Sequence, residues 1–180
     1  MKKELYQKIN IPSGVEVSVK GNTVKVKGPE GEVVKEFNFG ILDAKAENSE
    51  FKIGHKSATK NEKKIINSIS AHVKNMIKGV QKQFEYTLKV ASSHFPMTIK
   101  IEGDTATIKN YYGEKTDRKT KIPKGVHVSV NKDIITIKSP DKELAGQAAA
   151  NFENVTKVSN RDRRIFQDGV YITNKAGKEI

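Results

Sequence analysis

The four arginines of this chain have the side chains best suited to directed recognition of an anion, and all of them lie in its second half. They are Arg118, Arg161, Arg163 and Arg164. A guanidinium group forms planar two-point hydrogen bonds with phosphate and stacks on nucleobases, whereas the lysine ammonium group is a point charge. Arginines confined to two short segments therefore indicate directed recognition of a polyanion.

The arginines lie within two basic segments that also contain aromatic residues. Residues 109–124 hold six basic and two acidic residues with two adjacent tyrosines, and residues 157–178 hold the same charges with a phenylalanine and a tyrosine. Aromatic rings between cations suit stacking on unpaired nucleotides. In the rest of residues 83–180, acidic residues outnumber basic ones, so positive charge is concentrated in these segments. The alternative for each is a solvated loop with an occasional core tyrosine.

Side chains that could carry catalysis or bind a metal show no such pattern. Four histidines are present: His55, His72, His94 and His127. They lack metal-ligand spacing, and the chain has no cysteine. His72 lies on the apolar period of a predicted helix, so we interpret it as a packing residue. The glycine-rich stretch 28–31 lacks the lysine of a phosphate loop. We expect no enzyme, metal site, cofactor or small-molecule substrate.

The overall charge favours a polyanionic partner. The formal net charge is +12 and the isoelectric point is about 9.7, which implies nucleic acid or an acidic surface. No apolar run reaches the roughly 18 residues of a membrane span, and residues 1–11 lack the apolar core of a signal peptide. We therefore expect a soluble cytoplasmic protein. A stand-alone nucleic-acid chaperone or single-strand binder is the main alternative. A membrane-surface protein is a weaker one, because neither predicted helix has a basic face with large exposed apolar residues.

An internal repeat predicts the elements that position these segments. Residues 17–32 align without a gap to residues 99–114, an offset of 82 (99 against 17). Both copies alternate apolar and polar residues around a glycine followed by asparagine or aspartate, which predicts a β-hairpin in each. A weaker match relates residues 44–53 to residues 128–137.

A helical period follows the hairpins in both halves, at residues 65–80 and 144–155. Thr59 with Glu62 predicts a capping box, and Gly79 predicts the end of the first helix. Four lysines near the start of that helix could contact phosphate or lie in a solvated loop. They are Lys56, Lys60, Lys63 and Lys64.

The second helix is predicted to begin with Ser139 as N-cap and Pro140 in its first turn, and Gly146 to allow close packing on a sheet. Residues 11–19 also resemble residues 122–130. That alignment would break the order of the elements, so we interpret it as convergence at strand starts. The fold class is α+β, with two tandem similar domains, residues 1–82 and 83–180. Each is an antiparallel β-sheet with one packed α-helix, and the second domain ends in a basic C-terminal tail.

Short motifs spread along the chain are similar to those of one known family. They are Asn75-Met76-Ile77 with Gly79-Val80, His94-Phe95-Pro96, Asn110 with Gly113-Glu114-Lys115, Gly146-Gln147 with Ala149-Ala150, and Phe166-Gln167-Asp168-Gly169 with Tyr171. Together they resemble the universal large-subunit ribosomal protein numbered six in bacteria and nine in eukaryotes, in its archaeal and eukaryotic form. The sequence departs from that pattern at Tyr111-Tyr112, in place of phenylalanine and leucine, and at Ser139, in place of glycine.

The resemblance implies a structural protein of the large ribosomal subunit that supports translation. Its expected partners are large-subunit rRNA and neighbouring ribosomal proteins, close to where translational GTPases dock, with most RNA contacts in the second domain and the tail. The predicted RNA-binding residues are His94, Phe95, Lys109, Tyr111, Tyr112, Lys115, Arg118, Lys119, Lys121, Arg161, Arg163, Arg164, Phe166, Tyr171 and Lys175.

Overall fold

The computed structural model describes residues 3–47 and 49–180, and the chain divides into two compact units. The first unit comprises residues 1–83 and the second comprises residues 84–180. The division falls one residue after the expected boundary between residues 82 and 83. Each unit combines antiparallel sheets with one α-helix, so the predicted α+β class is confirmed.

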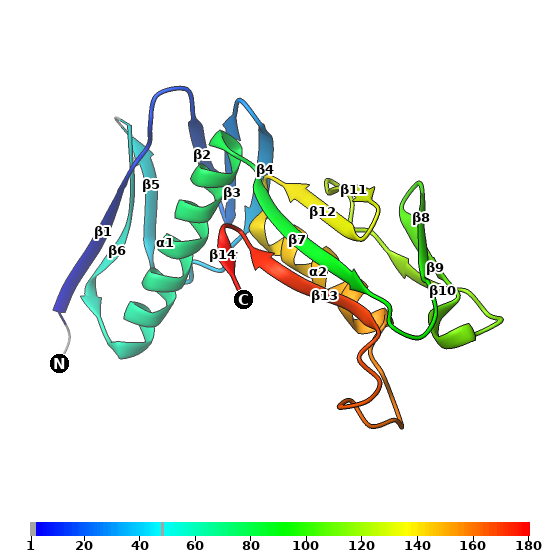
Figure 1. Ribbon diagram of the computed structural model, residues 1–180. Coiled ribbons are helices and arrows are strands. Elements are labelled where there is room, and N and C mark those ends of the chain that lie inside the picture. Colours follow the sequence, from blue (N-terminus) through cyan, green and yellow to red (C-terminus); the bar gives the residue numbers. More distant parts are fainter. Residues whose placement is uncertain (1–2, 48) are drawn as a thin grey trace. The chain divides into compact units, whose positions relative to one another are not determined.

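The first unit has two three-stranded sheets and a long helix (Figure 1). Its elements are β1 (Lys3–Asn10), β2 (Glu16–Lys20), β3 (Thr23–Gly28), β4 (Gly31–Glu36), β5 (Asp43–Glu47), β6 (Glu50–Ala58) and α1 (Lys60–Gln81). The sheets have the orders β1-β6-β5 and β2-β3-β4, and α1 packs against strands of both. Strands with alternating apolar residues each bury one face, and the helix covers the apolar side.

The helix α1 starts as predicted and ends later than predicted. Thr59 and Glu62 form the capping box, with Asn61 N donating to Thr59 Oγ1 and Thr59 N donating to Glu62 Oε2. Gly79 does not end the helix. The helix continues to Gln81, and Val80 is fully buried. The carbonyl of Val80 accepts a hydrogen bond from Glu30 N (2.9 Å), so the β3–β4 turn satisfies a carbonyl in the last turn of α1.

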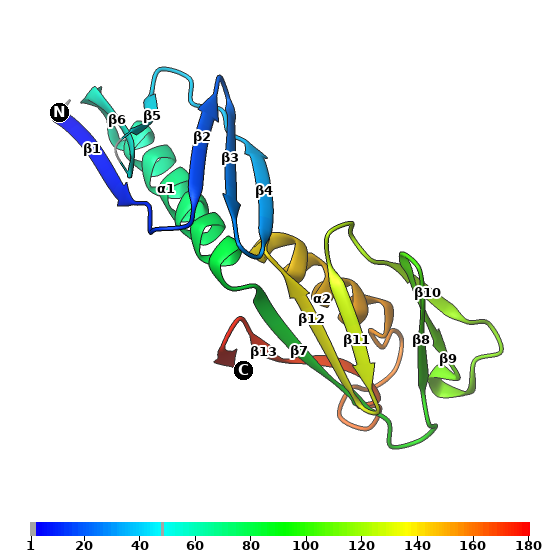
Figure 2. The ribbon, with the colours of Figure 1, turned by 90° about the horizontal axis from the view of Figure 1, so that it is seen from above.

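The second unit also has two antiparallel sheets, here of five and three strands (Figure 2). Its elements are β7 (Phe84–Ala91), β8 (Thr98–Glu102), β9 (Thr105–Lys109), the 3₁₀ turn η1 (Tyr111–Gly113), β10 (Arg118–Lys121), β11 (His127–Asn131), β12 (Ile134–Ser139), α2 (Lys142–Val155), β13 (Gly169–Lys175) and β14 (Lys178–Glu179). The sheet orders are β11-β12-β7-β13-β14 and β10-β9-β8. Ala145, Ala148 and Ala149 of α2 are buried, and α2 packs on β7, β12 and β13.

The predicted start of α2 is wrong by two residues. Its N-cap is Asp141, whose side chain accepts from Glu143 N (2.9 Å). Ser139 instead ends β12 and is fully buried, and its hydroxyl donates to the carbonyl of Gly125 (3.0 Å). The Ser139 hydroxyl also accepts from Asp141 N (3.2 Å), so it stabilises the turn before the helix while Asp141 is the N-cap.

Strand register confirms the internal repeat. Val17 pairs with Val26 and Val19 with Val24 in the first unit. In the second unit the pairs 82 residues later are Ile99–Ile108 and Ile101–Ala106. The competing alignment matched residues 11–19 with residues 122–130. It would equate β2 with β11, which belong to sheets of different order, so it breaks the order of the elements as expected. Its interpretation as convergence stays a prediction.

The two copies differ after their matching hairpins. In the first unit, β3 turns directly into β4 through Gly28–Gly31. In the second unit, η1 and a further loop separate β9 from β10, and η1 carries both adjacent tyrosines. The helix α2 is followed by a loop and by β13, which pairs with β7. The additions to the repeat therefore include the residues predicted to bind RNA in η1 and in the loop after α2.

Candidate RNA interface

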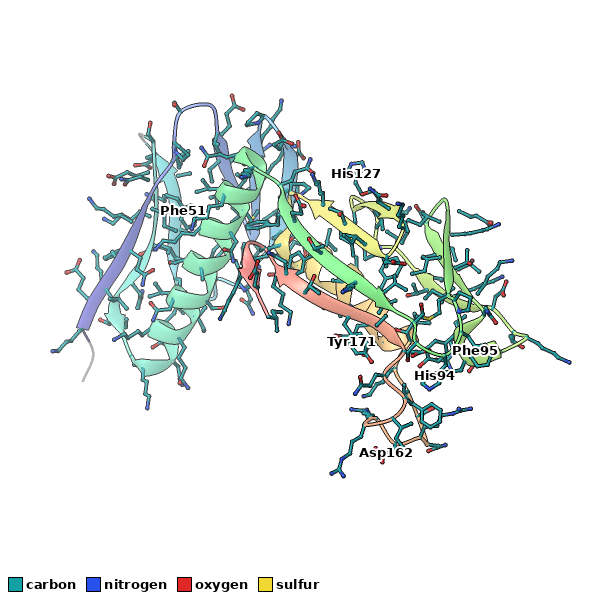
Figure 3. The ribbon with its side chains drawn as sticks, in the orientation of Figure 1. Phe51, His94, Phe95, His127, Asp162 and Tyr171 are labelled. Atoms are coloured by element: carbon teal, nitrogen blue, oxygen red, sulfur yellow. The ribbon has the colours of Figure 1, made fainter. Side chains whose placement is uncertain are left out.

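Three segments of the second unit, far apart in sequence, meet in one place. They are the β7–β8 loop, η1, and the loop between α2 and β13, which Figure 3 shows projecting from the sheet with Asp162 far from its base. His94 and Phe95 lie close to the base of that loop, as does Tyr171 at the start of β13. The fold thus assembles residues that were predicted from the two basic segments and from a family motif.

Asp168 joins two of these segments. Its side chain is buried (1% of the residue exposed) and accepts hydrogen bonds from Ser93 N and His94 N, both at 2.9 Å. The Ser93 hydroxyl also donates to it, and His94 Nδ1 lies 3.1 Å from Oδ1. Burial favours the neutral acid, but these hydrogen bonds together hold the pKa of Asp168 well below its usual range. The carboxylate is therefore ionised and fixes the β7–β8 loop to the start of β13.

Aromatic rings gather above this carboxylate. The His94 ring stacks on Phe166, with centroids 5.5 Å apart, and Tyr112 meets Phe166 edge-on at 5.6 Å. The guanidinium carbon of Arg161 lies 4.8 Å from the Phe166 centroid and 5.2 Å from that of Tyr112. We call His94, Tyr112, Arg161, Phe166 and Asp168 the loop cluster. Four of its five members were predicted RNA-binding residues.

The backbone of η1 turns its two tyrosines to different environments. Asn110 and Tyr112 both have positive φ (60° and 48°), a conformation that costs a non-glycine residue about 1–2 kcal/mol. Compensating contacts hold the turn: Asn110 Nδ2 donates to the carbonyl of Pro96 (3.0 Å), and Asp168 N donates to the hydroxyl of Tyr112 (3.1 Å). As a result, Tyr112 joins the loop cluster and Tyr111 is buried.

Tyr111 and Arg118 were predicted to bind RNA, and the structure gives both side chains partners within the protein. Tyr111 is 2% exposed, and its hydroxyl donates to the carbonyl of Thr156 (2.7 Å). Burial raises the pKa of Tyr111 to about 12. Arg118 lies 4.1 Å from the centroid of the Tyr111 ring and donates to Val155 O (2.8 Å) and to both carboxylate oxygens of Glu114 (2.8 and 2.6 Å). Tyr111 is therefore a core residue, whereas Arg118 is half-buried and its contact with RNA stays a prediction.

The remaining predicted residues are exposed to different degrees around the loop cluster or away from it. The exposed ones are Phe95, Lys115, Lys119, Lys121, Arg163, Arg164, Tyr171 and Lys175. Lys109 is exposed and pairs with Asp117 (3.2 Å). Lys175 lies at the far end of β13 from Gly169, about 20 Å away at 3.3 Å per residue, so it is not part of the loop cluster.

Acidic residues of the two basic segments are engaged internally. Glu114 binds Arg118 and Asp117 binds Lys109. Asp168 holds the β7–β8 loop, and Asp162 accepts from Arg164 N (2.9 Å) within its own turn. The positive charge of the exposed lysines and arginines is therefore left to face the solvent.

Asp168, Ser93 and Thr156 are the supporting residues that sequence reasoning missed as site residues. Asp168 entered only as part of a family motif, and it is 75 residues from Ser93 in the chain. Thr156 is buried, its carbonyl accepts from Tyr111, and its hydroxyl accepts from Val170 N (2.9 Å). Periodicity carries no signal for such long-range polar pairs, and only the motif containing Asp168 could have indicated one.

Two other sequence predictions concern residues of the first unit. His72 is half-buried on α1 with its ring 5.8 Å from that of Phe37, which confirms that it is a packing residue. The lysines near the start of α1 are exposed: Lys56, Lys60, Lys63 and Lys64. Their contact with phosphate stays a prediction.

Among the described residues, no group of three or more histidines or acids could hold a metal ion, and no helix is long and apolar enough to cross a membrane.

Comparison with known proteins identifies close relatives of both halves of the chain. The sequence profile of the family described as ribosomal protein L6 matches residues 11–83 and 95–169. The chain is 41% identical to the large ribosomal subunit protein uL6 of Methanothrix thermoacetophila, over 97% of this chain and 99% of that protein. It is also 41% identical to uL6 of Methanococcus vannielii (98% and 97% covered) and 40% identical to uL6 of Sulfurisphaera tokodaii (95% and 92% covered).

Proposed function

Because the chain belongs to the ribosomal protein L6 family, we propose that it binds large-subunit rRNA through the loop cluster and the exposed cations around it. As a member of this family it is a structural protein of the large ribosomal subunit, supports translation in the cytoplasm, and is not an enzyme. Its partners are the rRNA and other proteins of that subunit. Membership favours this role over that of a stand-alone nucleic-acid chaperone.

The observation that carries the proposal is the setting of Arg161. Its guanidinium lies over the rings of Tyr112 and Phe166, which limits its rotation while its edge remains able to donate hydrogen bonds. Arg163 and Arg164 follow on the same projecting loop and are exposed. Fixed donors of this kind lose little conformational entropy when they bind phosphate.

Recognition through phosphates and shape fits this arrangement. Folded RNA offers a dense phosphate backbone, and base edges in the deep groove of an A-form helix are out of reach of side chains. Phosphate contacts set the position and orientation of the bound protein. The projecting loop would enter a groove or junction of the RNA, with the loop cluster at its base.

The family resemblance supports a proposal about the neighbourhood of the bound protein. We propose that the second unit contacts rRNA close to where translational GTPases dock, and that the first unit acts mainly as a spacer and docking surface for neighbouring proteins. Hydroxyl-radical cleavage from an iron chelate tethered at an introduced cysteine on the projecting loop would test this. Cleavage should occur at rRNA that a bound translational GTPase also protects. Cleavage confined to rRNA remote from that region would contradict it.

A charge-removal variant tests the proposal directly. We expect Arg161→Gln, Arg163→Gln and Arg164→Gln together to weaken incorporation into the large subunit, measured by gradient sedimentation at moderate and high salt. Each lost phosphate contact should reduce the slope of the logarithm of the binding constant against the logarithm of the salt concentration by roughly 0.7–0.9. A smaller slope would therefore identify the defect as a loss of phosphate contacts. The matched control is Lys100→Gln, Lys132→Gln and Lys138→Gln, which removes three exposed charges from other strands and turns of the same unit. Unchanged incorporation of the arginine variant at high salt would contradict the proposal.

A further inference from the structure

A cavity of about 260 Å³ lies beside the loop cluster, between the C-terminal end of α2 and the start of β13. Glu153 and Asn154 of α2 contribute to its lining. Lys157 and Arg163 of the following loop line it as well, together with the rings of Phe166 and Tyr171. It thus combines flat aromatic surface, amide and carboxylate groups, and two cations.

Tyr171 is the ring best suited to accept a stacked partner in this cavity. The residue is 42% exposed although it lies on a strand, and its hydroxyl donates to the carbonyl of Gln167 (3.0 Å), which fixes the ring. A Cβ atom added at Gly169 would lie 3.3 Å from the Tyr171 ring, so the backbone supports the ring closely. Phe166 is already stacked on His94 and lies against Arg161, so it serves as a wall.

The polar groups of the cavity have the chemistry to read a base and hold its phosphate. Within residues 3–47 and 49–180, the side chains of Glu153 and Asn154 make no hydrogen bond or ion pair, so their donors and acceptors are available. An amide offers both a donor and an acceptor to a base edge, and a carboxylate accepts from exocyclic amino groups. Lys157 and Arg163 are exposed at the cavity and can neutralise the attached phosphate.

We propose that this cavity binds a single unpaired nucleotide of the RNA, with its base stacked on Tyr171 and its edge facing Asn154 and Glu153. This inference rests on the proposed function and adds a specific contact to it. Unpaired bases of loops and bulges are splayed out and stacked on aromatic side chains, whereas bases within a duplex remain paired and cannot enter a cavity of this size. The cavity would therefore distinguish a particular bulge or loop, while the surrounding cations hold any nearby backbone.

The test combines binding with base-specific chemical probing of a large-subunit rRNA transcript, using the full chain. Tyr171→Leu should lower affinity about tenfold, as expected for the loss of one base–aromatic stack, and should expose one base that the wild-type protein protects. Tyr171→Phe keeps the ring without the hydroxyl and should retain the affinity and the protection. Asn154→Ala, on the helix surface, should expose the same base, and circular dichroism would verify that each variant is folded.

The possible results separate this inference from the proposed function. Normal RNA binding with identical protection by wild type, Tyr171→Leu and Asn154→Ala would overturn the inference and leave the proposed function standing. Absence of RNA binding by the wild-type chain would overturn both. Titration with AMP, GMP, CMP and UMP tests a free nucleotide as the ligand. Binding of one of them that depends on Tyr171, with an RNA footprint that does not, would also overturn the inference.

Discussion

At the scale of residues, the candidate interface depends on a buried negative charge that is not exposed at its surface. Asp168 binds the β7–β8 loop through two backbone N–H groups and the side chain of Ser93, and His94 contacts both this carboxylate and Phe166. Without it, the segment carrying His94 and the segment carrying Phe166 would lose their common anchor. A positively charged surface is thus organised around an acid.

Replacing this acid should therefore destabilise the second unit in a pH-dependent way. We expect Asp168→Asn to lower the free energy of unfolding by about 1–3 kcal/mol at pH 7. The amide NH₂ group of asparagine is a donor, and the groups around it, Ser93 N, His94 N and the Ser93 hydroxyl, are donors as well. The folded-state pKa of Asp168 is depressed, so its contribution is complete at neutral pH. It decreases as the pH falls below about 4, where the unfolded chain takes up the proton.

Urea unfolding followed by tyrosine fluorescence would measure this difference, because four of the five tyrosines belong to the second unit. Asp104→Asn, at the exposed β8–β9 turn, serves as control and should change stability little. An Asp168→Asn effect that stayed constant from pH 7 to pH 3 would show that the ionised carboxylate is not the cause.

The residue types of the interface could be predicted from the sequence, but their orientations could not. Tyr111 and Tyr112 are adjacent within one basic segment, and composition assigns both the same role. The positive φ of Tyr112 separates them, since it directs one ring to the loop cluster and leaves the other in the core. Arg118 was predicted from its charge. Its partner Glu114 lies four residues earlier in the chain, whereas its contact with Val155 depends on how β10 packs against α2.

At the scale of elements, two glycines differ in how closely a neighbouring element approaches their backbone. A Cβ atom on Gly54 of β6 would collide with the carbonyl of Leu5 and the ring of Tyr6 on β1. A Cβ atom on Gly146 of α2 would lie 3.4 Å from the hydroxyl of Tyr86, an ordinary contact. Gly146 was predicted to allow close packing together with the neighbouring alanines, and Ala145, Ala148 and Ala149 are buried.

The same substitution at these two positions should therefore have opposite effects. We expect Gly54→Ala to destabilise the first unit by more than about 2 kcal/mol, because β1 must move away from β6. Gly146→Ala should stabilise α2 by roughly 0.5–1 kcal/mol, since alanine loses less backbone entropy in a helix. Thermal unfolding of both variants against the wild type would measure the pair, and a loss of stability in Gly146→Ala would show that the Tyr86 contact is tighter than the geometry indicates.

Element types were more predictable than element ends. Alternating residues located the hairpins with the correct register, and the capping box located the start of α1. The end of α1 and the start of α2 were mispredicted because tertiary contacts override local signals there. The carbonyl of Val80 is satisfied by Glu30 N, and Ser139 is held as the last residue of β12, buried with its hydroxyl donating to Gly125 O.

At the scale of the whole molecule, the first unit has the larger net charge and the second unit has the arginines. The first unit has 16 lysines and 9 acidic residues, whereas the second has 17 basic and 12 acidic residues and all of the arginines. The first unit is therefore the more positive of the two. If net charge alone determined RNA binding, the first unit would be the stronger binder.

Binding experiments on the separate units would decide whether net charge or the arrangement of the loop cluster determines RNA binding. We expect residues 84–180 alone to fold, since the strand pairs of their sheets and their hydrophobic cluster are all within the unit. They should bind the rRNA transcript with nearly the salt dependence of the full chain, because counterion release depends on the phosphates contacted. Residues 1–83 should bind more weakly at every salt concentration despite their larger net charge. Filter binding between about 50 and 200 mM salt would measure both slopes, and stronger binding by residues 1–83 would show that diffuse lysine charge rather than the loop cluster dominates recognition.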